Sequence, residues 1–281
     1  MRCRHQILRR FAPKDKLLTM ILYVYAIGRA GHPPPERVEA IDGSDVVGKF
    51  GCGELAAFAT PVVDPAEFSQ PVIDARSKDV EWLGAIGYRH QNVMAALMRG
   101  GTIIPLRAFT LFASEESLCR HVESEREQFA KILDRLDGKQ EWTLRIEFNP
   151  EQWSDALVRR VAPLRDLSDQ MRDAQPGKAF LLGKKLDEEK KRASREAEET
   201  VVGEIERAVL DKLACDTVAE SRQQRSGAFP QINVLIDRDE EARLEELRRD
   251  VESRYAADGV SVALTGPWPP YSFAGTMNDE R

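Results

Sequence analysis

The run Leu264-Thr265-Gly266-Pro267-Trp268-Pro269-Pro270-Tyr271-Ser272-Phe273 places three prolines, one glycine and three aromatic side chains near the end of the chain. Proline fixes the backbone angle φ and removes an amide donor, so this run cannot form a central β-strand. We therefore expect an extended or turned segment, called the tail segment below, whose aromatic side chains dock on a surface. That surface is either the protein's own core or a partner, and both remain open.

The tail segment follows a strand-helix-strand pattern. The expected elements are a strand over 229–236, a helix over 238–256 and a strand over 260–264. Within the helix, Leu244, Leu247 and Val251 recur at helical spacing and mark one apolar face. A long, highly charged helix is expected before this block, over about 179–217, and a shorter one over about 152–173. Together these elements predict a ferredoxin-like unit.

Closer to the amino terminus, from Met20 onward, strands alternate with helices. Strands are expected over 21–27, 46–50, 54–62, 102–109 and 141–148, and helices over 79–99 and 114–136. Gly51-Cys52-Gly53 is typical of a hairpin turn, and Ser114 followed by acidic residues is typical of a helix start.

These patterns predict an α+β protein with two domains. The N-terminal mixed α/β sheet domain is expected over 20–150 and the C-terminal ferredoxin-like α+β domain, with its long helix, over 151–281. Residues 1–19 are rich in Arg and Lys and lack an apolar signal region, so we expect a disordered basic extension.

Composition limits the possible partners. The chain has 281 residues, of which 42% are hydrophobic and 31% charged, a balance that supports a folded core. Its formal net charge is -6, so the basic field that drives phosphate-backbone binding is missing. No apolar run approaches the ~20 residues that span a bilayer. We therefore expect neither nucleic acid nor a lipid membrane as partner.

The cysteines and histidines show no reactive pattern. Cys3, Cys52, Cys119 and Cys215 are scattered, without zinc-site spacing or the density of a disulfide scaffold, which favours a reducing, cytoplasmic compartment. His90 stands alone in an expected helix, and we interpret it as a packing residue. With no phosphate-binding loop and no metal-ligand spacing, we predict a non-enzymatic protein without cofactor or metal.

Several motifs, in this order, resemble the GvpL/GvpF family of gas vesicle proteins. They are an opening strand with Tyr23, a helix with His90 followed by Ile104-Pro105-Leu106-Arg107, the start of the long helix at Ala179-Phe180-Leu181-Leu182-Gly183-Lys184-Lys185, and the end of the tail segment. The chain departs from the family at Ala108-Phe109-Thr110, where Phe-Gly-Thr commonly follows Pro-Leu-Arg.

The resemblance implies an accessory protein required for gas vesicle assembly. It implies binding to the hydrophobic shell protein and to other accessory proteins, in the cytoplasm during assembly and at the gas vesicle. The alternatives are a minor structural component of the vesicle wall and a nucleic-acid-binding ferredoxin-like protein. Arg107 is interpreted as a buried ion-pair partner, with an interface anchor as the alternative. The candidate partner-binding or structural residues are Pro105, Arg107, Trp268, Pro269, Pro270, Tyr271 and Phe273.

Overall fold

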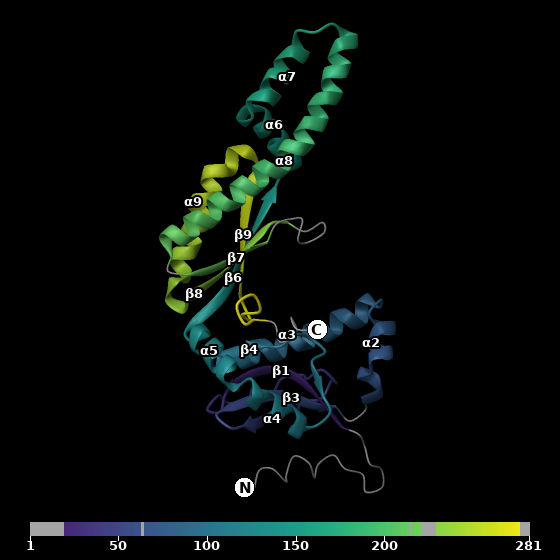
Figure 1. The fold of residues 1–281 in the computed structure, drawn as a ribbon, viewed down its shortest axis with the longest axis vertical. Coiled ribbons are helices and arrows are strands. Elements are labelled where there is room, and N and C mark those ends of the chain that lie inside the picture. The colour runs from purple at the N-terminus through teal and green to yellow at the C-terminus, as the bar shows by residue number, and fades with distance from the viewer. Residues whose placement is uncertain (1–19, 63–64, 214, 221–228, 276–281) are drawn as a thin grey trace. The chain divides into compact units, whose positions relative to one another are not determined.

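The computed structural model describes residues 20–62, 65–213, 215–220 and 229–275 (Figure 1). The expected basic extension over 1–19 therefore lies outside the described residues. The chain forms two compact units, the first ending at Arg135 and the second beginning at Leu136. Each unit is described by itself.

The described part of the first unit contains a five-stranded antiparallel sheet. Its strands are β1 (Ile21–Arg29), β2 (Gly48–Cys52), β3 (Leu55–Val62), β4 (Ile103–Pro105) and β5 (Leu111–Phe112). The strand order is β2-β3-β1-β4, and β5 also pairs with β1. Strand β1 is buried from Leu22 to Gly28, as its β-branched and aromatic composition predicts. The predicted hairpin is confirmed, since β2 and β3 pair around Gly53.

Helices cover this sheet. They are the short 3-10 turn η1 (Pro65–Phe68), α2 (Gln70–Arg76), α3 (Val80–Gly100), α4 (Glu115–Ser124) and α5 (Arg126–Leu136). The buried face of α3 packs against Tyr23 and Tyr25 of β1. The helix expected over 114–136 is two helices, because Glu125 leaves the helical conformation at φ -101° and ψ 11°. The sequence there has no Gly or Pro to signal the break.

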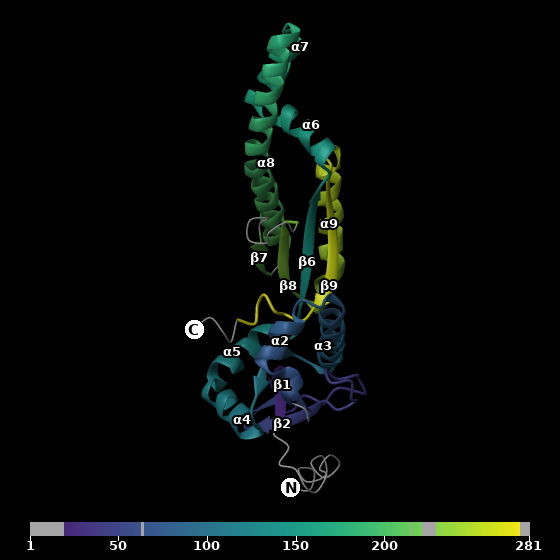
Figure 2. The ribbon, with the colours of Figure 1, turned by 90° about the vertical axis from the view of Figure 1, so that its right-hand side faces the viewer.

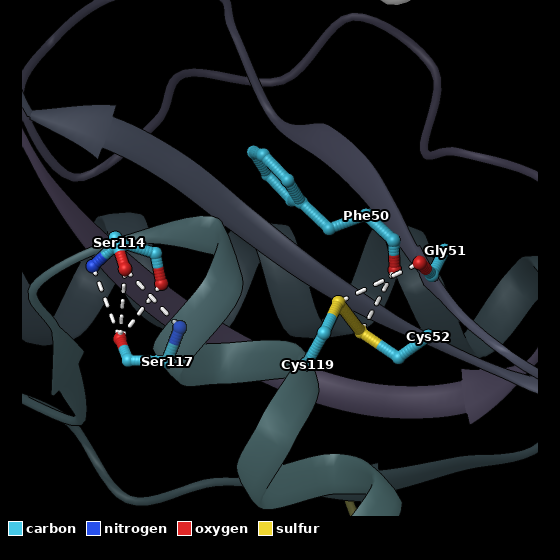
Figure 3. Close-up of a disulfide and its surroundings, with 6 residues drawn as sticks. All are labelled: Phe50, Gly51, Cys52, Ser114, Ser117 and Cys119. Carbon is cyan, nitrogen blue, oxygen red and sulfur yellow. Dashed lines mark hydrogen bonds between the residues drawn. A yellow bond between two sulfur atoms is a disulfide. The ribbon is translucent and has the colours of Figure 1, made fainter.

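A disulfide joins Cys52 at the end of β2 to Cys119 in α4 (Figure 3). Helix α4 is positioned at its start by a reciprocal capping pair, in which Ser114 and Ser117 each bond the other's backbone amide. The disulfide corrects our expectation of reduced cysteines. The two residues are 67 positions apart, and sequence spacing alone does not show that the fold brings their Cα atoms to 4.9 Å.

The second unit has a four-stranded antiparallel sheet. Its strands are β6 (Lys139–Phe148), β7 (Asp216–Glu220), β8 (Gln231–Asp237) and β9 (Val260–Trp268), in the order β7-β8-β6-β9. In the order of the described elements, helices lie between β6 and β7 and between β8 and β9, and β8 is the next element after β7. This is the β-α-β-β-α-β topology of a ferredoxin-like unit.

The helices of this unit are α6 (Pro150–Arg160), α7 (Ala162–Arg172), α8 (Pro176–Lys212) and α9 (Glu241–Tyr255), with 3-10 turns η2 (Arg238–Glu240) and η3 (Ala256–Asp258). The apolar residues of the second half of α8 and those of α9 pack in one core with the sheet. The first half of α8 runs beside α7, so the two form a helical hairpin that extends past the sheet (Figures 1 and 2).

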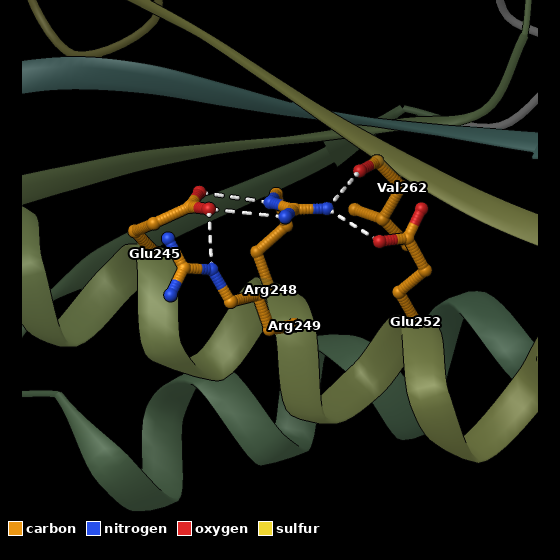
Figure 4. A network of polar contacts seen from close by, with 5 residues as sticks. All are labelled: Glu245, Arg248, Arg249, Glu252 and Val262. Carbon is orange, nitrogen blue, oxygen red and sulfur yellow. Dashed lines mark hydrogen bonds and ion pairs between the residues drawn. The ribbon is translucent and has the colours of Figure 1, made fainter.

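Arg248 fastens α9 to the last strand (Figure 4). Its guanidinium donates to the carbonyl of Val262 at 3.1 Å and to the carboxylates of Glu245 and Glu252 at 2.8 and 2.7 Å. Arg249 donates to the same Glu245 carboxylate, and the hydrogen bonds from Arg248 and Arg249 lower the pKa of Glu245. The network holds β9 immediately before the tail segment begins.

Several details differ from the expectations. The strand over 141–148 is expected in the N-terminal domain, but β6 pairs with β8 and β9 of the second unit. Alternation of apolar residues predicts a strand but does not predict its partners. The helix over 152–173 is divided into α6 and α7 near Pro163, whose ring disfavours a continuous helix. The long helix ends at Lys212, and the short strand β7 follows it, unpredicted.

Candidate functional site

The last strand continues into the tail segment. Strand β9 was expected to end at Leu264 but runs to Trp268, paired with β6 through Thr265 and, beyond a bulge, through Trp268. Pro267 is tolerated because β9 lies at the edge of the sheet. The first residues of the tail segment, up to Trp268, therefore extend the sheet, and the residues after Trp268 leave it.

Gly266 allows the close approach of the tail segment to Trp142. Its φ of +146° is rarely adopted by other residues, and an added Cβ would lie 2.8 Å from Cε3 of the Trp142 ring. Trp142 itself is buried on β6. The fold therefore favours glycine at this position of the Thr-Gly-Pro-Trp motif, because a larger residue would clash with the Trp142 ring.

A buried carboxylate holds the next turn. Glu141 on β6 accepts the backbone amide of Ser272 at Oε2, 3.0 Å away, and the Ser272 hydroxyl at Oε1, 2.8 Å away. The same hydroxyl accepts from Nδ2 of Asn233 at 3.0 Å, and Asn233 accepts from the Thr143 hydroxyl at 2.8 Å. Buried polar groups are stable only when such partners are present. We call Glu141, Asn233, Thr143 and Ser272 the tail clamp.

The side chains of the tail segment differ in exposure. Phe273 and Pro269 are buried, whereas Trp268 is 40% exposed and Tyr271 is 37% exposed. The Trp268 indole donates to the Thr265 hydroxyl at 3.3 Å, which restrains its ring. Burial of its hydroxyl and the nearby Glu141 charge raise the pKa of Tyr271 to about 12, so its hydroxyl stays protonated at neutral pH. The tail segment therefore packs on its own unit through Phe273 and leaves the rings of Trp268 and Tyr271 partly exposed.

Pro105 and Arg107, from the other motif, lie in the first unit. Pro105 is buried and pairs with Ala26 of β1. Arg107 is exposed, so its interpretation as a buried ion-pair partner is wrong, and its carbonyl accepts from the amide and hydroxyl of Thr110. The structure thus does not unite these two residues with the tail segment in one compact unit.

His90 has a structural setting. The Tyr23 hydroxyl accepts from the amide of Phe109 at 3.1 Å and lies 2.9 Å from Nδ1 of His90. His90 also bonds the Leu106 backbone, and a neutral ring that donates there accepts the Tyr23 proton at Nδ1. Burial lowers the pKa of His90 to about 4. A neutral His90 therefore positions the Pro105-Leu106-Arg107 segment, consistent with a packing residue.

The sequence interpretation missed the clamp residues. Asn233 carried a signal, because an amide inside the apolar run Ile232–Ile236 needs a buried partner. The sequence around Glu141 gave no signal of a buried partner, since an acid at the start of an alternating strand normally faces water.

The described residues show no reactive centre of familiar type. In the described ranges, no three His, Cys, Asp or Glu side chains are grouped to hold a metal ion. The thiol of Cys215 has a pKa raised to about 11, mainly by burial, so it is not an activated nucleophile. Among the helices that the structure describes, none is long and apolar enough to cross a membrane.

Fold and site together define a mixed α/β protein whose ferredoxin-like second unit carries a clamped aromatic tail. The chain belongs to the family of the gas vesicle synthesis protein GvpL/GvpF, whose model matches residues 21–275. This membership gives it a role connected with gas vesicles, in a family of accessory proteins that is not a known enzyme family.

Curated relatives and solved structures agree with this family membership. The chain is 28% identical to gas vesicle protein L of Streptomyces sp. (strain CB03234) over 92% of its length and 94% of that protein. It is 26% identical to gas vesicle protein F of the same strain, over 90% of the chain and 99% of that protein. The crystal structure of GvpF from Anabaena sp. PCC7120 shares its fold, with a TM-score of 0.67, 13% identity and coverage of 91% and 98% of the two chains. GvpF from Microcystis aeruginosa matches with a TM-score of 0.64, 14% identity and coverage of 91% and 99%.

Proposed function

We propose that this protein is a non-enzymatic gas vesicle assembly factor that binds the hydrophobic shell protein through Trp268 and Tyr271. The observation that carries the proposal is the pair of part-exposed aromatic rings held in place by the tail clamp. We propose further that it acts in the cytoplasm during assembly, together with other accessory proteins, and then reaches the gas vesicle.

The physical reasoning begins with the shell protein. An apolar subunit that polymerises into a wall exposes surface that must be covered before it is added. Aromatic side chains are effective anchors on such surfaces because they bury a large area with few rotatable bonds.

Preorganisation adds to this advantage. Pro267, Pro269 and Pro270 stiffen the tail segment, and Glu141 and Asn233 fix its turn through Ser272. Little conformational entropy is then lost when Trp268 and Tyr271 meet a partner.

The test is capture of purified shell protein by the full chain carrying Trp268→Ala or Tyr271→Ala. We expect each substitution to weaken capture by at least ~10-fold, as loss of an interface anchor does, with an unchanged melting temperature. The matched control is Phe229→Ala, because Phe229 is a similarly exposed aromatic, 41%, outside the tail segment.

Wild-type capture by both tail variants, with folding intact, would refute the proposed surface. Failure of the wild-type chain to capture shell protein would refute the proposed function. Washed, intact vesicles that retain the wild-type chain as a stable component would instead favour the wall-component alternative.

A further inference from the structure

The two cysteines of the disulfide in Figure 3 differ in exposure. Cys52 is buried, with 3% of its surface exposed, whereas Cys119 is partly exposed. Thiol–disulfide exchange begins when a thiolate reaches one of the two sulfur atoms, so access helps to decide which sulfur is attacked. The structure therefore favours attack at Cys119.

The turn beside the disulfide does not shield Cys119. The carbonyl oxygen of Gly51 lies 3.5 Å from Sγ of Cys119, and this glycine has no side chain that could cover the sulfur. Gly53, on the other side of Cys52, has no side chain either. Both glycines are exposed, and no atom lies within 4 Å of where a Cβ would be on either of them.

Both ends of the disulfide are held in place by other contacts. In α4, Ser114 and Ser117 cap the start of the helix, and Leu118 and Val122 are fully buried. Strand β2 pairs with β3 as far as Cys52. The Cα atoms of the two cysteines lie 4.9 Å apart, within the range usual for disulfides. After cleavage, the fold therefore keeps the two thiols close enough to form the bond again.

Two backbone carbonyl groups suit the reduced state of the pair. The Phe50 oxygen lies 3.7 Å from Sγ of Cys52, and the Gly51 oxygen lies 3.5 Å from Sγ of Cys119. A sulfur atom in a disulfide has no hydrogen to donate, whereas a thiol is a weak donor. Each thiol of the reduced chain thus has a carbonyl acceptor beside it, so the site accommodates both redox states.

We propose that Cys119 is the site at which a low-molecular-weight thiol, such as glutathione, forms a reversible mixed disulfide with this protein. The thiolate of the small molecule attacks Sγ of Cys119 and forms a new sulfur–sulfur bond there. The bond between Cys119 and Cys52 breaks, and its electron pair leaves with Sγ of Cys52, which takes up a proton. This inference does not rest on the proposed function.

Two further steps are open to the mixed disulfide. The Cys52 thiol, as its thiolate, attacks Sγ of Cys119, expels the small thiol and restores the original bond. Alternatively, a second small thiol attacks the sulfur of the bound one, which leaves both cysteines as thiols and joins the two small molecules in their own disulfide. The link between β2 and α4 therefore follows the ratio of reduced to oxidised small thiol.

Cys215, in the second unit, is a poor site for the same chemistry. Burial is the main cause that raises the pKa of its thiol to about 11, so little of the reactive thiolate is present at neutral pH. We therefore expect exchange to be selective for Cys119 among the cysteines that the structure describes.

The first test compares the two cysteines as single free thiols in the full chain. Cys52→Ser leaves the Cys119 thiol, and Cys119→Ser leaves the Cys52 thiol. Both variants also carry Cys3→Ser, because Cys3 lies outside the described residues. With glutathione disulfide, we expect Cys119 to form the mixed disulfide at least ~10-fold faster than Cys52, because burial lowers the reactivity of a thiol. Peptide mapping by mass spectrometry locates and counts the glutathione adduct.

The second test keeps both cysteines and so does not depend on how these variants fold. The chain with Cys3→Ser alone is treated with reduced glutathione and stopped with acid at short times. We expect the adduct on Cys119 to exceed that on Cys52 by at least ~10-fold. Cys215→Ser in this background is the matched control and should react at the same rate.

Urea distinguishes attack on the folded chain from attack on the unfolded chain. At urea concentrations well below the unfolding transition, we expect the rate of adduct formation to stay nearly constant, because the Cys119 sulfur is reached in the folded state. Circular dichroism and melting show that each variant is folded before it is compared.

Three results would overturn the proposal. They are an adduct on Cys52 that equals or exceeds the adduct on Cys119, a folded chain that does not react with glutathione, and a rate that rises with urea in parallel with the unfolded fraction.

Discussion

Glu141 and Ser272 are 131 residues apart, yet one carboxylate accepts both the backbone amide and the hydroxyl of that serine. The first strand of the second unit therefore holds the last described turn of the chain. Through Ser272 this contact also determines where Tyr271 and Phe273 lie. The stability of the tail segment and any binding by its aromatic rings are consequently linked to one buried acid.

Glu141→Gln should loosen the tail segment. The substitution replaces one carboxylate oxygen by an amide group that faces the donors of Ser272, and an unpaired buried donor costs roughly 1–3 kcal/mol. We expect the free energy of unfolding of the second unit to fall by about this amount in urea titrations. Hydrogen exchange at the Ser272 amide should accelerate in parallel.

Glu147→Gln is the matched control for Glu141, because it lies on the same strand but pairs with Arg145 at a partly exposed position. A surface pair of this kind contributes about 0–1 kcal/mol. Equal effects of the two substitutions would contradict a special role for the clamp.

Gly266→Ala should destabilise the chain more than a substitution at an unhindered glycine. The new methyl group meets the Trp142 ring and also demands a backbone conformation that alanine rarely adopts. We expect a loss of about 2 kcal/mol or more, measured by thermal unfolding. Gly138→Ala is the control, because Gly138 has φ +71° but no atom within 4 Å of the added Cβ. A loss no larger than that of the control would remove the steric argument.

His90 should make stability depend on pH. Its pKa is about 4 in the folded chain and 6.5 at its ordinary value, so the unfolded chain binds more protons between these limits. Stability is therefore fully present above pH ~6.5 and falls as pH decreases to about 4, by roughly 3 kcal/mol for this one residue. His90→Asn, which keeps a polar atom near the Nδ1 position but does not titrate, should show a shallower decline. Parallel curves for wild type and variant in urea unfolding would exclude this contribution.

The disulfide should stabilise the first unit. Closing a loop with cysteines 67 positions apart lowers the entropy of the unfolded chain, which corresponds to roughly 4 kcal/mol. A thiol reductant should therefore lower the melting temperature of wild type but not of Cys119→Ser. Cys215→Ser is the control, because Cys215 is a free thiol and its loss should leave the effect of the reductant intact. Insensitivity of wild type to the reductant would show that the bond does not stabilise the fold.

The helices and strands that depend on local sequence patterns could be predicted from the sequence. Helix α3 and the strands β1 and β8 follow from periodicity and composition, and the start of α4 follows from Ser114, because these signals act over a few residues. The tail segment identified the family because its composition is so unusual.

Contacts between distant residues were not predictable. Nothing near Glu141 indicates that its partner is Ser272, and the spacing of Cys52 and Cys119 does not indicate that they meet. The helix expected to extend to Thr217 ends at Lys212, because the pairing of β7 with β8 outweighs local helical preference. Exposure of Arg107 likewise depends on how β4 leaves the sheet, which its neighbours in sequence do not specify.

The tail clamp also affects the order in which the protein can form during synthesis. The first unit ends at Arg135 and can fold while the ribosome is still translating the rest. The second unit must wait, because Trp142 and Glu141 on its first strand are completed only by Gly266 and Ser272. A chain that is released early, before these residues are made, keeps an indole uncovered and a carboxylate without its serine. Such chains would expose apolar surface to proteases and chaperones, because the tail segment is not made and does not pack on the second unit.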